Sequence, residues 1–189
     1  MENKPSNFFK GHLLIAMPGL LDPNFDQTVT LLCEHNNEGA IGIVLNRVHP
    51  LLSGRDIFEE LELKPSSGAQ NIPIHIGGPV NINEIFVLHG PPFEWEGCFQ
   101  INPDIGMSNT IDILTAVAEG GGPESFIISL GCAGWGPGQL ESEIMQNAWL
   151  TSSVLEEIIF NIPVEERWEA AVKRMGIDPT LLTDAAGHA

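Results

Sequence analysis

The sequence predicts an α+β fold in which a compact mixed β-sheet is flanked by helices. Apolar residues make up 43% of the 189 residues, which is enough to close one sizeable core. Segments rich in β-formers come first, and segments with helical spacing are interspersed later. Residues 125–130 form a short, almost wholly apolar run, which is typical of a central strand covered on both faces. Together these features favour a mixed sheet over an all-parallel Rossmann sheet.

Turn-forming residues separate the segments that we expect to be strands. The cluster Asn36-Asn37-Glu38-Gly39 lies between two apolar runs, so it predicts a β-hairpin. Pro18-Gly19 ends the first run, and Gly77-Gly78-Pro79 separates two later ones. The expected strands are 13–17, 28–34, 40–45, 72–76, 82–88, 125–130 and a short strand at 98–101 within the irregular segment 90–109.

Four segments are expected to be helical. Ser53 is the expected N-cap of a helix through residue 63, and Ser108 or Asn109 caps a helix that stops at Gly120. A third helix covers 139–147, and the last begins at Pro163 and ends at Gly176. Residues 158–162 fit either a strand or a helix.

The charge distribution excludes several classes of function. The chain has 8 basic and 25 acidic residues, a formal net charge of −17. No Lys or Arg occurs between Lys64 and Arg167, whereas that stretch holds 13 acidic residues. Such a surface repels phosphate backbones and anionic lipid, which argues against a DNA-binding domain and a basic membrane anchor. The apolar content excludes a disordered acidic tail.

Cysteine usage and the N-terminal segment indicate a cytoplasmic protein. The cysteines are odd in number and form no C-x-x-C motif, so neither a disulfide framework nor a zinc ribbon is expected. The apolar run at 13–21 is interrupted by Pro18-Gly19 and lacks a small-x-small cleavage site. It is also much shorter than the ~20 residues of a membrane helix.

The glycine-rich segment 131–138 has the layout of an anion site, a strand followed by a turn and a helix. Its spacing matches neither a dinucleotide fingerprint nor a phosphate loop, and no lysine follows. Glu141 and Glu143 in the helix would repel a phosphate. We therefore interpret the segment as a structural turn. An exposed Trp135 would suit a neutral or cationic ligand or a protein partner.

The cysteines and histidines allow a second interpretation, a small-molecule enzyme. Cys132 follows the buried strand, as nucleophiles of α/β enzymes do, but the G-x-S-x-G spacing is absent. Cys33 and His35 alternate on an expected strand, so both would face one side and could chelate a metal. No H-x-x-x-H or H-E-x-x-H motif occurs, and the sequence predicts no cofactor or metal.

Several blocks of sequence together resemble the YqgE/AlgH family of bacterial proteins. They are G-H-L-L-I-A-M-P-G-L-L-D-P-N-F-D (11–26), L-L-C-E-H-N-N-E-G-A-I-G-I-V-L-N-R (31–47), G-G-P-V (77–80), V-L-H-G (87–90), G-W-G-P-G-Q-L-E-S-E-I (134–144), N-A-W-L (147–150) and R-W (167–168). The resemblance covers 11–176 as a single domain, with 1–10 as a flexible N-terminus and 177–189 as a C-terminal tail. The chain departs from the family pattern at Cys132, where Tyr is usual, and at Val48, where Pro is usual.

The resemblance implies a branched, coiled mixed sheet and a bacterial cytoplasmic setting. Family members carry the label of transcriptional regulator, but the family supplies no catalytic residues. Because the charge disfavours DNA, we expect regulation through an unknown protein partner or a small ligand.

Our leading hypothesis is a regulatory or binding protein, and the enzyme using Cys33/His35 or Cys132 is the alternative. Loops rich in Gly, Asn, His and Trp at strand ends are typical of binding sites. The candidate ligand- or partner-binding residues are Asn36, Gly77, Gly78, His89, Gly134, Trp135, Gly136 and Gln139. No residue is predicted to be catalytic, and the sequence does not predict the oligomeric state.

Overall fold

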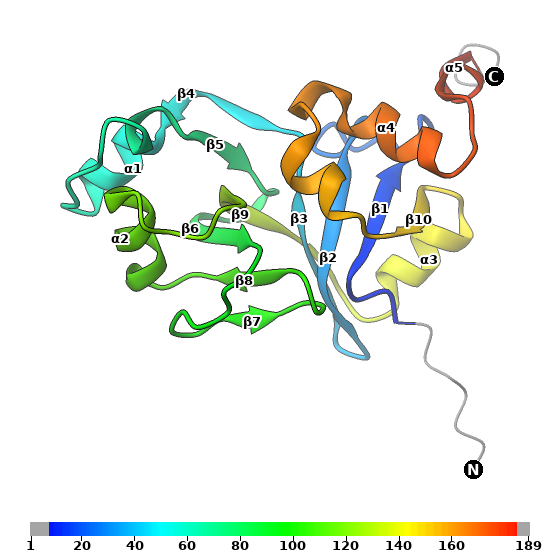
Figure 1. The fold of residues 1–189 in the computed structure, drawn as a ribbon. Coiled ribbons are helices and arrows are strands. Elements are labelled where there is room, and N and C mark those ends of the chain that lie inside the picture. Colours follow the sequence, from blue (N-terminus) through cyan, green and yellow to red (C-terminus); the bar gives the residue numbers. More distant parts are fainter. Residues whose placement is uncertain (1–7, 185–189) are drawn as a thin grey trace.

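A computed structural model of the chain describes residues 8–184 and confirms the α+β class (Figure 1). The strands are β1 His12–Ala16, β2 Val29–Asn36, β3 Gly39–Val44, β4 Val48–Ser53, β5 Pro73–Ile76, β6 Val80–His89, β7 Phe99–Gln100, β8 Gly106–Ser108, β9 Phe126–Trp135 and β10 Trp149–Ser153. The helices are α1 Gly54–Glu60, α2 Ile111–Glu119, α3 Gln139–Met145, α4 Arg167–Arg174 and α5 Pro179–Asp184. Short helical turns are η1 Ala69–Asn71, η2 Glu157–Asn161 and η3 Val164–Glu166.

The sheet is mixed and branches at β9. Its main path runs β10-β1-β2-β3-β9-β6-β8-β7, and all the pairs along it are antiparallel. β5 leaves this path by pairing with β9 in parallel, and β4 pairs with β5. β9 therefore has three partner strands along its length, which makes it the centre of the fold.

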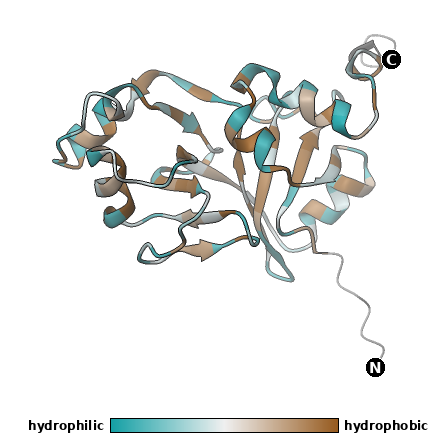
Figure 2. Ribbon diagram, in the orientation of Figure 1, coloured by the Kyte–Doolittle hydropathy of each residue, from teal (hydrophilic) through white to brown (hydrophobic). Residues whose placement is uncertain are grey.

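Helices cover both faces of the curled sheet (Figures 1 and 2). The apolar residues of helices and strands pack together in three core clusters. α4 and η2 pack their apolar side chains on the face that carries Leu13, Leu31 and Ile43. α3 packs on the opposite face, against Trp135 and Trp149. α1 and α2 form the third cluster with β5, β6 and β9. Burial of these clusters is the main stabilising term of the fold.

The expected hairpin is present, but it contains a β-bulge that the sequence pattern does not predict. The β2–β3 register pairs Leu32 with Gly42 and then Glu34 with Ile41, so Cys33 is an extra residue in β2. The bulge reverses the alternation of side chains. Cys33 therefore faces the cluster under α4, whereas His35 lies opposite Ala40 on the face that packs α3. The prediction that Cys33 and His35 share a face is wrong.

Strand β9 continues through most of the segment that was interpreted as a glycine-rich turn. It extends to Trp135, five residues beyond the expected end at 130. Gly131 lies in this strand with φ +71°. The position requires glycine because the backbone of Gly78 approaches too closely for a side chain. The glycines are thus structural, as interpreted, but they serve close packing inside the sheet as well as the turn at Gly138, whose φ is +73°.

The expected helices are confirmed with small shifts at their ends. Ser53 is the N-cap of α1, and both its backbone N–H and its hydroxyl donate to Asp56 Oδ2 at 2.8 Å. The N-cap of α2 is Thr110 rather than Ser108 or Asn109. The ambiguous residues 158–162 lie largely in the helical turn η2. Strands β4, β8 and β10 and helix α5 were not expected.

A buried arginine joins α4 to the sheet. Arg167 is 5% exposed, and its guanidinium donates to the carbonyl oxygens of Ile162 and Leu45. Its Nη1 also lies 3.4 Å from Nε2 of the buried His75 on β5. Burial lowers the pKa of Arg167 to about 10, so the side chain stays charged near neutral pH.

The buried His75 is expected to make stability depend on pH. Burial, and secondly the charge of Arg167, lower the pKa of His75 from 6.5 to about 4. His75 binds a proton at higher pH in the unfolded chain than in the native state. Its contribution to the free energy of unfolding is therefore fully present above pH 6.5 and is lost as the pH falls toward 4. The expected loss is roughly 3 kcal/mol, measured by urea unfolding between pH 7.5 and 4.5.

The matched control for this pH dependence is His75→Gln, which removes the titrating group. Its unfolding free energy should fall less steeply over the same range, although His89, whose pKa burial also lowers, keeps some of the slope. The carboxyl groups with lowered pKa, Asp56, Asp112 and Asp178, titrate below 3.8 and thus outside this window. Equal slopes for both proteins would contradict the assignment.

The predicted division of the chain stays a prediction. Residues 1–7 and 185–189 lie outside the described residues, and α5 falls within the predicted tail. Phe9, in the predicted N-terminal extension, donates its backbone N–H to His35 Nδ1 at 3.0 Å. None of the helices within residues 8–184 has the length and apolar character of a membrane-spanning segment.

Candidate functional site

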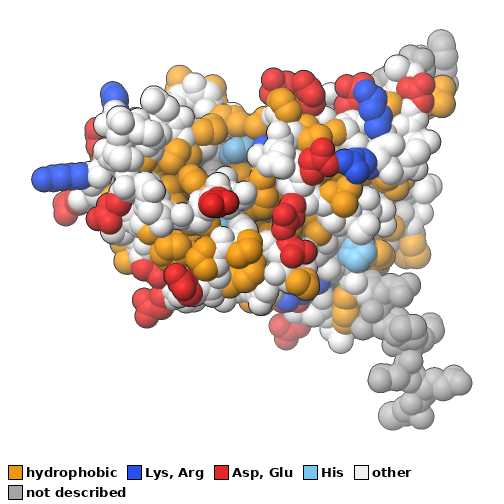
Figure 3. All heavy atoms as spheres, viewed as in Figure 1, with side chains coloured by type: hydrophobic (Ala, Val, Ile, Leu, Met, Phe, Trp, Pro, Cys, Tyr) orange, Lys and Arg blue, Asp and Glu red, His pale blue; other side chains and the backbone are white. Residues whose placement is uncertain are grey.

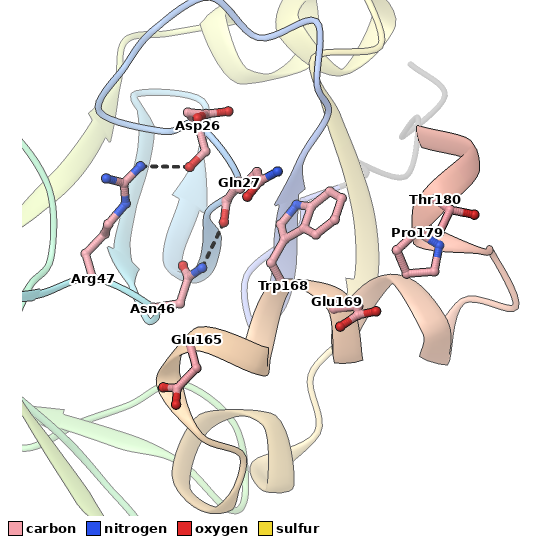
Figure 4. A pocket seen from close by; sticks show the side chains of 9 residues that line it. All are labelled: Asp26, Gln27, Asn46, Arg47, Glu165, Trp168, Glu169, Pro179 and Thr180. Carbon is pink, nitrogen blue, oxygen red and sulfur yellow. Dashed lines mark hydrogen bonds between the residues drawn. The ribbon is translucent and has the colours of Figure 1, made fainter. Parts of the chain in front are cut away.

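A pocket of about 570 Å³ opens between the loop after β1, the end of β3 and helix α4 (Figure 4). The nine residues that line it are Asp26, Gln27, Asn46, Arg47, Glu165, Trp168, Glu169, Pro179 and Thr180. None of them is among the predicted binding residues. Asp26, Asn46, Arg47 and Trp168 lie within the sequence blocks that resemble the family.

Hydrogen bonds from the segment between β3 and β4 hold the loop wall of this pocket in place. Asn46 donates from Nδ2 to the carbonyl oxygen of Gln27 at 2.8 Å, and its Oδ1 accepts the N–H of Val29 at 2.8 Å. Gln27 has φ +51°, a left-handed conformation that this pair of bonds supports. Arg47 donates from Nη2 to the carbonyl oxygen of Asp26 at 2.7 Å. The pocket wall is therefore preorganised by two adjacent side chains.

The opposite wall rests on a buried tryptophan. Trp168 is 7% exposed and donates from Nε1 to the carbonyl oxygen of Ala16 at 2.9 Å, which ties α4 to β1. Glu165 and Glu169 are exposed on the same side of the pocket. Because both walls are anchored to the sheet, the pocket is a feature of the folded core rather than of loose loops.

A second pocket, of about 420 Å³, lies on the other side of Arg47 and is more apolar. Its lining is Pro23, Asn24, Val44, Arg47, Ile76, Gly78, Pro79 and Ile82. Ile76 is 37% and Ile82 is 62% exposed, which is unusual for isoleucine in a folded chain. Arg47 lines both pockets, so we call the two together the Arg47 groove.

The electrostatic character of the groove differs between its halves. The lining of the 570 Å³ half includes Asp26, Glu165 and Glu169 together with Arg47, whereas the 420 Å³ half has no acidic residue in its lining. Figure 3 shows carboxylate side chains spread over the face it displays. The groove therefore suits a ligand with hydrogen-bond donors or positive charge at one end and apolar groups at the other.

Five of the eight predicted binding residues do come together, at the tip of the β2–β3 hairpin. Asn36 and Trp135 line a small pocket of about 190 Å³ there. Gly134 and Gly136 flank Trp135, and Gln139 accepts the N–H of Gly136 at 3.0 Å. Trp135 is 6% exposed and donates from Nε1 to Glu143, so it is not the exposed ring that a ligand would stack on.

The other three predicted residues lie elsewhere. Gly77 and Gly78 pack on the backbone of Gly131 and Cys132, and Gly78 also lines the Arg47 groove. His89 is completely buried and pairs with Phe126 at the start of β9, whereas Trp135 is at its end. A ten-residue strand spans about 30 Å. The eight residues therefore do not form one surface, and a binding role for each stays a prediction.

The thiols of the alternative enzyme hypothesis lack the features of nucleophiles. Burial raises the pKa of Cys33 and of Cys132, which disfavours the thiolate. His35 uses both ring nitrogens, since Nδ1 accepts from Phe9 and Nε2 donates to Glu141 Oε1 at 3.0 Å. Within residues 8–184 no group of three or more His, Cys, Asp or Glu side chains is placed to hold a metal.

Comparison with known proteins tests the family resemblance that the sequence blocks suggested. The sequence pattern of the AlgH-like family matches residues 13–180. The chain belongs to the AlgH-like family. A UPF0301 protein of Desulforapulum autotrophicum is 53% identical over 189 residues and covers all of both chains. One from Paracoccus denitrificans is 46% identical over 187 residues, 97% of this chain and 98% of the relative.

Two solved structures share the fold of this AlgH-like chain. The AlgH protein of Pseudomonas aeruginosa superposes with a TM-score of 0.81 at 44% identity and full coverage of both chains. A protein of Corynebacterium diphtheriae has a TM-score of 0.71 at 20% identity, covering 92% of this chain and 90% of the other, which supports the fold alone. No specific biochemical function is established by these relationships.

Proposed function

We propose that this AlgH-like chain is a regulatory binding protein that recognises a basic, partly apolar segment of a protein partner along the Arg47 groove. The observation that carries the proposal is that Arg47 joins an acidic pocket to an apolar one. The carboxylates of Asp26, Glu165 and Glu169 would pair with Lys or Arg of the partner. The half lined by Ile76 and Ile82 would receive an apolar side chain.

Arg47 would itself bind acceptor groups of the partner. Within the described residues its side chain makes one hydrogen bond, to Asp26 O, which leaves most guanidinium donors for backbone carbonyl or carboxylate oxygens. The net charge of −17 supports a basic partner, because long-range attraction raises the rate of encounter. The same charge opposes DNA as the target of a transcriptional regulator.

The proposal predicts which peptides the protein selects from a random displayed library. Enriched peptides should combine basic residues with an apolar residue. The double variant E165K/E169K should lower their affinity about tenfold or more, since it reverses charge at the rim. Arg47→Ala should also lower it, by about tenfold, through loss of a central anchor. Affinities are measured by isothermal titration calorimetry at low and moderate salt.

The double variant E119K/E124K, at exposed positions outside the groove, reverses the same number of charges and is the matched control. It should leave the affinity nearly unchanged. Absence of any enriched peptide, or equal affinities for the rim variants and this control, would refute the proposal. A small molecule that stabilises the wild type but not Arg47→Ala in a thermal-shift screen would instead indicate a small ligand in the groove.

A further inference from the structure

Cys98 lies against the imidazole of His89, outside the Arg47 groove. Its Sγ is 3.7 Å from Nε2 of His89. Cys98 directly precedes β7, His89 is the last residue of β6, and β8 pairs with both strands. Cys98 is half-buried, whereas Cys33 and Cys132 are buried. Cys98 is thus the cysteine with the greatest access to solvent.

The hydrogen bonds of His89 define which nitrogen can accept a proton. Nδ1 lies 2.7 Å from the carbonyl oxygen of Gly90, which only accepts, so Nδ1 carries the hydrogen. Nε2 of the neutral ring is therefore an acceptor. The hydroxyl of Ser108 donates to it at 2.9 Å, and the thiol of Cys98 faces the same atom. The arrangement is that of a nucleophile beside an oriented base.

Gly106 provides the space for this contact. It lies opposite His89 in the β6–β8 pair. A Cβ at this position would be 3.0 Å from Cys98 Sγ and 2.9 Å from Cδ1 of Phe93, whose ring lies 5.8 Å from that of His89. A side chain here would displace the thiol, so the glycine allows the thiol to reach the imidazole.

We infer that Cys98 is a site of thiol–disulfide exchange with small neutral or cationic disulfides, with His89 as the proton acceptor. The Cys98 sulfur attacks one sulfur of the disulfide as its proton passes to His89 Nε2. A mixed disulfide bond forms, the original S–S bond breaks, and the departing sulfur takes the proton from His89 to leave as a thiol.

The choice of disulfide class follows from the surrounding charge. Glu94 and Glu96 precede Cys98 in the same loop, and the chain carries a net charge of −17. Lys10 is the nearby cation, with Nζ 4.1 Å from the ring centroid of Phe99. The field over the site is therefore expected to be negative, which disfavours anionic disulfides.

The experiment exposes the reduced full-length chain to cystamine or to oxidised glutathione and follows each cysteine by peptide mass spectrometry. Cys98 should form its mixed disulfide at least about tenfold faster than Cys33 and Cys132. Cystamine should react faster than oxidised glutathione, and added salt should narrow the difference. His89→Gln should slow the reaction of Cys98 by about a hundredfold, the lower end of a general-base contribution.

Two further variants test the geometry even where His89→Gln fails to fold. Gly106→Ala should slow Cys98 by displacing the thiol, and Ser108→Ala should accelerate it by freeing Nε2. The rates of Cys33 and Cys132 in each variant report any loosening of the fold and should stay unchanged. Similar rates at all three cysteines of the wild type would overturn the inference, as would a Cys98 rate that neither variant changes.

Discussion

Replacing Arg167 with methionine is expected to lower the free energy of unfolding by about 3 kcal/mol. Methionine fills much of the same volume but leaves the buried carbonyl oxygen of Leu45 and the partly buried one of Ile162 without their donor. Each unsatisfied buried carbonyl costs about 1–3 kcal/mol. The loss is measured by urea unfolding at pH 7.5, where His75 is neutral in both the native and most of the unfolded state.

The same helix offers a matched control. Arg174 also lies on α4, but its ion pair with Glu157 is exposed, with side-chain exposures of 47% and 52%. Arg174→Met should therefore change stability by only about 0.5 kcal/mol. If both substitutions lowered stability equally, the buried hydrogen bonds of Arg167 would not be the cause.

The second large effect is expected from Gly78→Ala. A Cβ on Gly78 would lie 2.3 Å from the carbonyl oxygen of Cys132 and 2.5 Å from the nitrogen of Ala133, and its φ of +150° is unfavourable for alanine. These are backbone atoms of the central strand β9, which cannot move aside without disturbing its three partner strands. We expect a loss of about 3 kcal/mol or more, as for severe overpacking, measured as a fall in the urea midpoint.

Gly68→Ala is the control for this substitution. Gly68 has φ −70°, and a Cβ there would meet nothing within 4 Å. Its stability should stay within about 0.5 kcal/mol of the wild type. A Gly78→Ala protein as stable as Gly68→Ala would contradict the role of Gly78 in close backbone packing.

Local sequence signals predicted the elements that depend on near neighbours. The turn at 36–39 joins β2 to β3 over a few residues, and Ser53 with Asp56 marks the start of α1. By contrast, β10 pairs with β1 from the opposite end of the chain, so nothing local marks Trp149–Ser153 as a strand. β4 contains Pro50, which argues against a strand, and it is tolerated because β4 pairs only with β5.

The candidate site depended even more on distant contacts. Asn46 and Arg47 gain significance only because their side chains reach the loop at Asp26 and Gln27, and because α4 closes the pocket from more than a hundred residues away. The bulge at Cys33 and the burial of His89 likewise arise from pairing across the sheet. Hydrophobic periodicity carries no information about such encounters.

The α+β class, the family, the hairpin and the large negative charge that disfavours nucleic acid follow from the amino-acid sequence alone. Composition and local pattern suffice for the class, the hairpin and the charge because these depend on residue types or on short-range spacing, whereas the family follows from the resemblance of the ordered sequence blocks. The three-dimensional fold was needed to show that the glycines of β9 serve backbone packing, that Trp135 is buried, and that Arg47 joins an acidic pocket to an apolar one. Those features arise where segments remote in the chain meet, and their geometry is set by the branching of the sheet at β9.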